Sequence, residues 1–116
     1  MIGDVTIAKK VYIVCGSTNM CNGIDGLVKI VSKSYKLDPR EPSLFAFCNR
    51  KQDRVKVLLW EGDGFTVIYK RLETHVLRWP QSEDQAKQIT PKQFDLLMSG
   101  KELKRASLTI SKTPMI

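Results

Sequence analysis

Cationic and aromatic side chains are interspersed in residues 49–73, which read NRKQDRVKVLLWEGDGFTVIYKRLE. Guanidinium and ammonium groups neutralise phosphates, and aromatic rings stack on unpaired bases. A hairpin that carries both kinds of group is therefore suited to contact with a nucleic acid. The candidate nucleic-acid-binding residues are Arg50, Lys51, Arg54, Lys56, Lys70, Arg71 and Arg78, and the candidate aromatic contact surface is Trp60, Phe65 and Tyr69.

Residues that could carry catalysis or hold a metal ion form no recognisable motif. The single histidine, His75, has no serine or cysteine partner in a nucleophile motif. Carboxylates at Asp25, Glu61 and Asp63 stand where a helix start or a turn favours them. The three cysteines include no C-x-x-C pair, and a zinc site would need a further strong ligand. We therefore expect no enzymatic activity, no metal and no cofactor.

The chain carries an excess of positive charge. Its 116 residues include 19 Lys and Arg against 12 Asp and Glu, giving a formal net charge of +7. Such an excess favours an anionic partner, nucleic acid before a membrane surface, although an ordinary basic soluble protein would show it too. The start MIGDVTIAKK lacks the pattern of a secretory signal, and no apolar run approaches the ~20 residues that span a bilayer. These features predict a cytoplasmic protein without a membrane partner.

The length of the chain predicts a single domain over residues 1–116. Residues 1–9 are expected to form a loose leader, and residues 107–116 a tail that frays. No internal repeat or low-complexity segment divides the sequence. The oligomeric state does not follow from the sequence.

Apolar periodicity predicts the elements that position the basic hairpin. Continuous or alternating apolar runs predict strands over 11–15, 44–48, 54–60 and 65–72, with a further strand over 76–79. An amphipathic helix begins at Ile24 and keeps Ile24, Leu27, Val28, Val31 and Tyr35 on one face. A second helix lies in TPKQFDLLMSG, with Thr90 as its cap. We therefore predict an α+β fold: an antiparallel meander of four to five strands, with the first helix packed on one face and a C-terminal helix.

Side-chain alternation then sorts the hairpin into two faces. A tight turn at Gly62-Asp63 places Trp60 opposite Phe65. One face then carries Arg54, Lys56, Leu58, Trp60, Phe65, Val67, Tyr69 and Arg71. The reverse face carries Val55, Val57, Leu59 and Ile68, with Thr66 and Lys70 near its edges, and is joined by Phe45 and Phe47 if Cys48 pairs with Arg54. We expect the reverse face to pack on the first helix and the mixed face to be the more exposed one. Alternatively, the aromatic residues form a second core patch under the C-terminal helix, with Arg and Lys stems lying over it.

The order and spacing of several motifs resemble a known family. These motifs are VYIVCGSTNMCNGIDGLVKIV, LFAFCNRKQDRVKVLLWEGDGFTVIYKRLE, RWP and the TPKQFDLLMSG helix, and together they cover about residues 11–106. They resemble TnpB (Orf2), the small accessory-protein family of the bacterial insertion sequences numbered sixty-six. One segment departs from the family pattern, because Asn19-Met20-Cys21-Asn22 stands where the family has an Asp-Met-Arg-Lys-like stretch.

The resemblance implies a protein that supports transposition beside a separately encoded, larger transposase. The partners it implies are the transposase and the DNA ends of the mobile element. Two functions remain open: a DNA-binding accessory factor that uses the basic hairpin face, and an adaptor that docks on the transposase without contacting DNA. The missing cations at Asn19–Asn22 favour the hairpin over that loop as the DNA contact.

Overall fold

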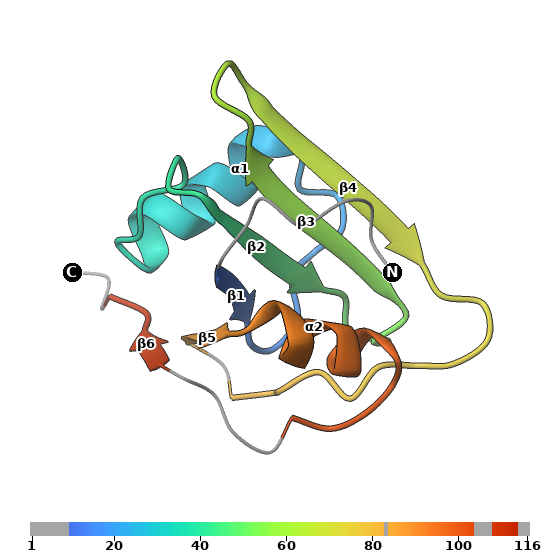
Figure 1. Cartoon of the computed structure of the whole chain (residues 1–116). Helices are drawn as coiled ribbons and strands as arrows, with labels where there is room; N and C mark the ends of the chain where they lie inside the picture. The colour runs from blue at the N-terminus through green and yellow to red at the C-terminus, as the bar shows by residue number, and fades with distance from the viewer. Residues whose placement is uncertain (1–9, 83, 104–107, 114–116) are drawn as a thin grey trace.

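A six-stranded sheet forms the centre of the structure, a computed structural model that describes residues 10–82, 84–103 and 108–113 (Figure 1). The strand order is β4-β3-β2-β1-β5-β6. The strands are β1 (Lys10–Val14), β2 (Ser43–Cys48), β3 (Arg54–Trp60), β4 (Phe65–Arg71), β5 (Gln85–Ile89) and β6 (Leu108–Ser111). The helical elements are α1 (Ile24–Lys29), the π-helical turn η1 (Ile30–Ser34) that continues it, and α2 (Pro91–Met98).

The strand pairing confirms part of the predicted meander. β2, β3 and β4 pair antiparallel in succession, with Trp60 opposite Phe65 as expected. β1 instead pairs in parallel with β2, because α1 and η1 connect the two strands as a crossover. β5 pairs antiparallel with β1, and β6 with β5. The α+β class is confirmed, but the purely antiparallel sheet of four to five strands is wrong: the sheet is mixed and has six strands.

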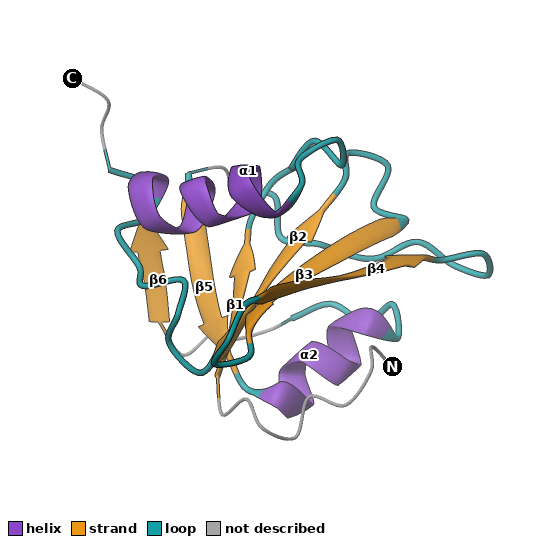
Figure 2. Ribbon diagram, turned by 90° about the horizontal axis from the view of Figure 1, so that it is seen from above, coloured by secondary structure: helices purple, strands orange, loops and turns teal. Residues whose placement is uncertain are grey.

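The helices lie on opposite faces of the sheet, with α1 over one face and α2 over the other (Figure 2). The core on the α1 side includes Tyr12, Leu27, Val31, Phe45, Phe47 and Leu58. The core on the α2 side includes Val11, Ile13, Val55, Val57, Phe94 and Leu97. Every residue of β2 is buried, which explains why its sequence is a continuous apolar run rather than an alternating one.

The register between β2 and β3 corrects the predicted assignment of faces. Cys48 lies opposite Val55 rather than Arg54, so Phe45 lies opposite Leu58. A shift of one residue moves every side chain of a strand to the other face. Phe45 and Phe47 therefore lie on the mixed face of the hairpin, under α1, and the reverse face packs against α2. The prediction that the first helix covers the Val55 face is wrong.

Residues 76–79 do not form the predicted strand, although their alternation is real. Leu77 and Trp79 are buried, whereas Val76 and Arg78 are exposed. The Leu77 N–H donates to the Gln52 carbonyl (2.7 Å), and the Trp79 indole N–H donates to the Val14 carbonyl (2.8 Å). This segment is thus fixed to a turn and a strand end rather than to a neighbouring strand.

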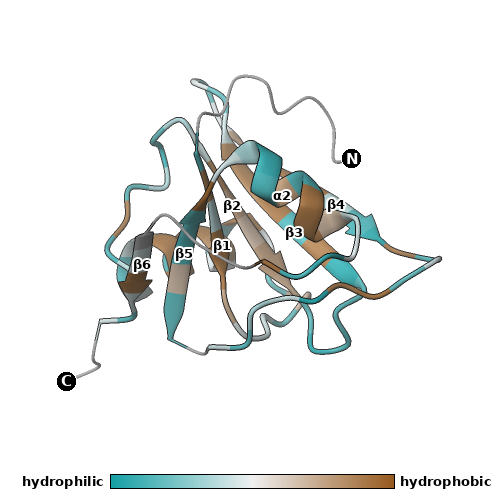
Figure 3. Ribbon diagram, turned by 60° about the horizontal axis from the view of Figure 1, so that its bottom comes forward, coloured by the Kyte–Doolittle hydropathy of each residue, from teal (hydrophilic) through white to brown (hydrophobic). Residues whose placement is uncertain are grey.

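The strand that follows it, β5, was not predicted. Its sequence QAKQI is mostly polar, as its largely teal colour in Figure 3 shows, and only Ala86 and Ile89 are buried. Of the tail that is predicted to fray, Leu108–Ser111 instead form β6. The predicted leader, residues 1–9, and the rest of the tail apart from 112–113 lie outside the described residues.

The predicted helices are confirmed. On the predicted apolar face of the first, Leu27, Val31 and Tyr35 are buried and Val28 is half-buried, but Ile24 is exposed at the start of the helix. At α2, the Thr90 hydroxyl accepts from the Gln93 N–H (3.1 Å), and the Gln93 side chain accepts from the Thr90 N–H (2.8 Å). This reciprocal pair satisfies backbone donors at the helix start. In the part of the chain that the structure describes, neither helix has the length and apolar content that crossing a bilayer requires.

Candidate nucleic-acid interface

An open groove of about 860 Å³ lies beside the basic end of the β3–β4 hairpin. One wall is the loop 17–21, which follows β1, and the other is the turn 49–51, which joins β2 to β3. The side chains of β3 and β4 that line it are Arg54, Lys56, Val67 and Tyr69. The groove therefore brings together segments that are about thirty residues apart in the sequence.

Cations gather around this groove. Arg54 lies opposite Arg71, and Lys56 lies opposite Tyr69, so all four side chains share one face of the sheet. Arg50, Lys51 and Arg54 are exposed, and none of them forms a salt bridge with any residue in the described ranges. Like charges this close repel one another, and an anion between them would remove the repulsion.

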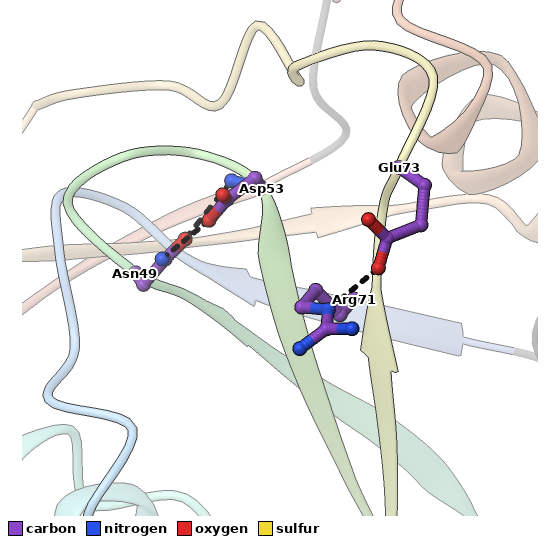
Figure 4. Close-up of polar contacts among 4 residues, drawn as sticks. All are labelled: Asn49, Asp53, Arg71 and Glu73. Atoms are coloured by element: carbon purple, nitrogen blue, oxygen red, sulfur yellow. Dashed lines mark hydrogen bonds and ion pairs between the residues drawn. The ribbon is translucent and has the colours of Figure 1, made fainter.

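Arg71 differs from the other cations because it has an acidic partner. Its Nε lies 2.6 Å from Glu73 Oε1 (Figure 4), and this hydrogen-bonded pair raises the pKa of the guanidinium further above its ordinary value. Both side chains are exposed, so the pair contributes little to stability. Arg71 therefore stands beside the groove with its charge partly compensated.

Lys56 supports the wall of the groove. Its ammonium donates to the Met20 carbonyl (2.7 Å) and to the Asn22 carbonyl (2.9 Å). The same nitrogen lies 5.9 Å from the centroid of the Tyr69 ring. Two of the three N–H donors of Lys56 are thus occupied by the chain itself, and the side chain fixes the position of the loop relative to β3 and β4.

The turn between β2 and β3 is built by Asn49 and Asp53. Asn49 Oδ1 accepts from the backbone N–H groups of Asp53 (3.0 Å) and Arg54 (2.9 Å). Asn49 Nδ2 donates to Asp53 Oδ1 (2.7 Å), as Figure 4 shows. The acidic side chain is therefore engaged with the turn itself, and Arg50 and Lys51, at its tip, are exposed.

The three predicted aromatic residues do not form one surface. Tyr69 lines the groove with 51% of its surface exposed. Trp60 and Phe65 lie at the opposite end of the hairpin, pack edge-to-face with ring centroids 4.9 Å apart, and are half-buried. The guanidinium of Arg40 lies 4.7 Å from the Trp60 ring. Of these three residues, Tyr69 is thus the one that lies beside the cations of the groove.

Two predicted cations lie away from the groove. Lys70 pairs with Val55 and so belongs to the α2 face of the sheet. Arg78 borders a different hollow, which Leu96 and Lys101 also line. The reverse-face position of Lys70 agrees with the predicted alternation, so Lys70 does not extend the positive field of the groove. Arg78 is separated from the groove by the path of residues 74–80.

The loop wall was not identified from the sequence as part of the site. The Thr18 N–H donates to the Cys48 carbonyl (2.7 Å), and Asn19 Oδ1 accepts from the Cys21 N–H (2.8 Å). These bonds hold a compact turn that presents Met20 and the exposed thiol of Cys21 to the groove. The turn-forming residues after Gly16 indicate a turn in the sequence, but no pattern in the neighbouring residues indicates that this turn faces β3.

The cysteines at positions 15 and 48 and the single histidine are held in structural environments, buried in the core or bonded to the backbone. Burial raises the pKa of the Cys48 thiol to about 12 and also raises that of Cys15. His75 Nε2 lies 3.0 Å from the carbonyl oxygen of Met98, at the end of α2, which places the imidazole against the backbone. Among the described residues, no group of three or more His, Cys, Asp or Glu could hold a metal ion.

Comparison with known proteins identifies a family and two similar proteins. The family model described as IS66 Orf2 like protein matches residues 9–107. The uncharacterized protein y4hO of Sinorhizobium fredii is 35% identical over 91 residues, which cover 78% of this chain and 79% of that protein. A second protein of that organism, y4jC, is 30% identical over 92 residues and covers 79% of each chain. No solved structure matches. The chain belongs to the IS66 Orf2-like family.

Proposed function

We propose that this protein is a non-catalytic accessory factor in the transposition of a bacterial insertion sequence and that it binds the element's DNA through the groove. The family supplies the general role in transposition. The observation that carries DNA binding is the cluster of Arg50, Lys51 and Arg54, which line the groove and form no salt bridge within the described ranges. Its partners are then the DNA ends of the element and the separately encoded transposase, in the cytoplasm.

Electrostatics gives this proposal a measurable signature. Each phosphate that a cation neutralises releases condensed counterions, so the logarithm of the affinity falls linearly with the logarithm of salt concentration. Three phosphate contacts would give a slope of roughly −3 on duplex DNA, at about −0.9 per contact. Arg54→Glu should lower the affinity and make the slope shallower by about one unit or more.

The test is a salt titration of binding to labelled DNA from the element's ends. Arg54→Glu is compared with Lys92→Glu, which makes the same charge change at an exposed position of α2, outside the groove. We expect the first variant to lose affinity and the second to lose much less. A salt-independent affinity, or equal losses in the two variants, would contradict binding through the groove.

A thiol reagent can locate the bound DNA independently. Cys21 is exposed beside the groove, whereas Cys15 and Cys48 are buried. We expect the reagent to modify Cys21 in the free protein and to modify it more slowly in the complex. An unchanged rate at saturating DNA would place the DNA elsewhere.

An adaptor that docks on the transposase is the alternative. The half-buried Trp60 and Phe65, flanked by Arg40, form an aromatic cluster at the far end of the hairpin. Aromatic and Arg side chains often dominate protein interfaces. Co-purification with the transposase in the absence of DNA, weakened by Trp60→Ala and not by Arg54→Ala, would favour the adaptor.

A further inference from the structure

We propose that the groove takes an unpaired stretch of a DNA strand, with Tyr69 stacking on a base while the surrounding cations hold the neighbouring phosphates. This inference rests on the proposed function and specifies the form of DNA that the same site binds.

The shape of the site favours a single strand. A protein that reads duplex DNA inserts a helix or a two-stranded ribbon into a major groove about 12 Å wide. In this structure α1 and α2 lie against the two faces of the sheet (Figure 2), and the β3–β4 hairpin is joined to β2 rather than being a free ribbon. The cations line a concavity between a loop and a turn. A concavity suits a flexible strand whose bases can turn toward the protein.

Tyr69 is the group that distinguishes base stacking from phosphate binding alone. It is exposed, whereas every other Phe, Trp and Tyr in the described ranges is buried or half-buried. Tyr12 and Phe45, for example, stack on each other within the core, with ring centroids 5.4 Å apart. An exposed ring in a cationic groove is the arrangement that single-strand-binding surfaces use for sequence-tolerant stacking.

The spacing of the neighbouring groups fits a nucleotide on this ring. Arg71 and Val67 lie two residues from Tyr69 along β4, roughly 7 Å away on the same face. Arg54 lies opposite Arg71 on β3, two pairs along the hairpin from Lys56 and Tyr69 and therefore on the same face. A base on Tyr69 would thus have guanidinium groups on one side for its phosphates and the apolar Val67 on the other.

The experiment measures fluorescence anisotropy with one labelled oligonucleotide of roughly 10 nucleotides, free or annealed into a blunt duplex. We expect the single strand to bind more tightly than the duplex. Tyr69→Ala should weaken single-strand binding by about 5- to 150-fold, the loss of one stacked base, and Tyr69→Phe should restore it. Thermal melting verifies that each variant is folded, as the exposed position of Tyr69 leads us to expect.

The outcomes separate the two proposals. If the duplex binds as tightly as the single strand and Tyr69→Ala changes neither affinity, the single-strand inference is overturned while DNA binding stands. If neither DNA binds, or if Arg54→Glu has no effect on either, the proposed function itself fails. Single-strand binding that depends on both Tyr69 and Arg54 supports both.

Discussion

Lys56 shows how one side chain can be read as a ligand contact from the sequence and prove to have a structural role as well. Its position on the basic face made it a candidate phosphate contact, and it does line the groove. Yet its ammonium donates to the backbone carbonyls of Met20, in the opposite wall, and of Asn22, directly after that wall. Replacing it therefore changes the shape of the site in addition to its charge.

This dual role predicts a loss of stability on Lys56→Met, which keeps most of the apolar stem and removes the ammonium. The carbonyls of Met20 and Asn22 would lose their charged donor, at a cost of about 1–2 kcal/mol in the free energy of unfolding. Arg54→Met is the matched control, because it removes a charge from the next pair of the same strand face but breaks no hydrogen bond of its side chain within the described ranges. Urea unfolding of both variants checks the prediction. Equal free energies of unfolding for Lys56→Met and Arg54→Met would show that the hydrogen bonds of Lys56 do not stabilise the fold.

At the scale of the elements, those specified by local sequence could be predicted, and those specified by long-range pairing could not. The α2 helix and the β3–β4 hairpin could be predicted because a cap, a proline, glycines and alternation all lie within a few residues of each other. Residues 76–79 have a strand-like alternation, but their hydrogen bonds go to Gln52 and Val14, which no local pattern indicates. β5 is a strand because β1 and β6 pair with it, not because QAKQI favours that conformation.

The cap of α2 allows a direct measurement of one such local signal. Thr90→Ala removes the hydroxyl that accepts from Gln93 N–H, and we expect the free energy of unfolding to fall by about 1 kcal/mol. Thr90→Ser keeps the acceptor and should retain most of the stability. A chemical denaturation series on the three proteins checks this. If both substitutions lowered the free energy of unfolding equally, the loss would instead be due to packing of the threonine methyl group.

For the whole molecule, the candidate site was predictable only in part. The hairpin alternation correctly placed Arg54, Lys56, Tyr69 and Arg71 on one face. The groove itself depends on the parallel pairing of β1 with β2, which brings the loop after β1 beside the turn after β2. The parallel pairing of β1 with β2 and the β2–β3 register depend on packing against both faces of the sheet. The pattern of a single sequence therefore does not determine them.

Burial of titratable groups across the whole fold predicts that the protein loses stability in alkali. Burial raises the pKa of Cys48 from 9.0 to about 12, and burial, with a smaller effect of Cys15 and Asp84, raises that of Tyr35 from 10.0 to about 12. Above each unfolded-state value the unfolded chain has lost a proton that the folded chain keeps. The free energy of unfolding therefore falls as the pH rises from about 9 to about 12 and is insensitive to these groups below that range.

The size of the effect can be apportioned between the two groups. At about pH 10.5, Cys48 should account for a loss of about 2 kcal/mol relative to about pH 8, and Tyr35 for about 1 kcal/mol. Urea unfolding at the two pH values measures the difference for the wild type, Cys48→Ala and Tyr35→Phe. Each variant has its own stability at pH 8, so the pH-dependent difference within each protein is compared. Cys48→Ala should reduce that difference more than Tyr35→Phe does. If Cys48→Ala left the pH dependence unchanged, the thiol would titrate in the folded protein as it does in the unfolded chain, and its burial in the core would be refuted.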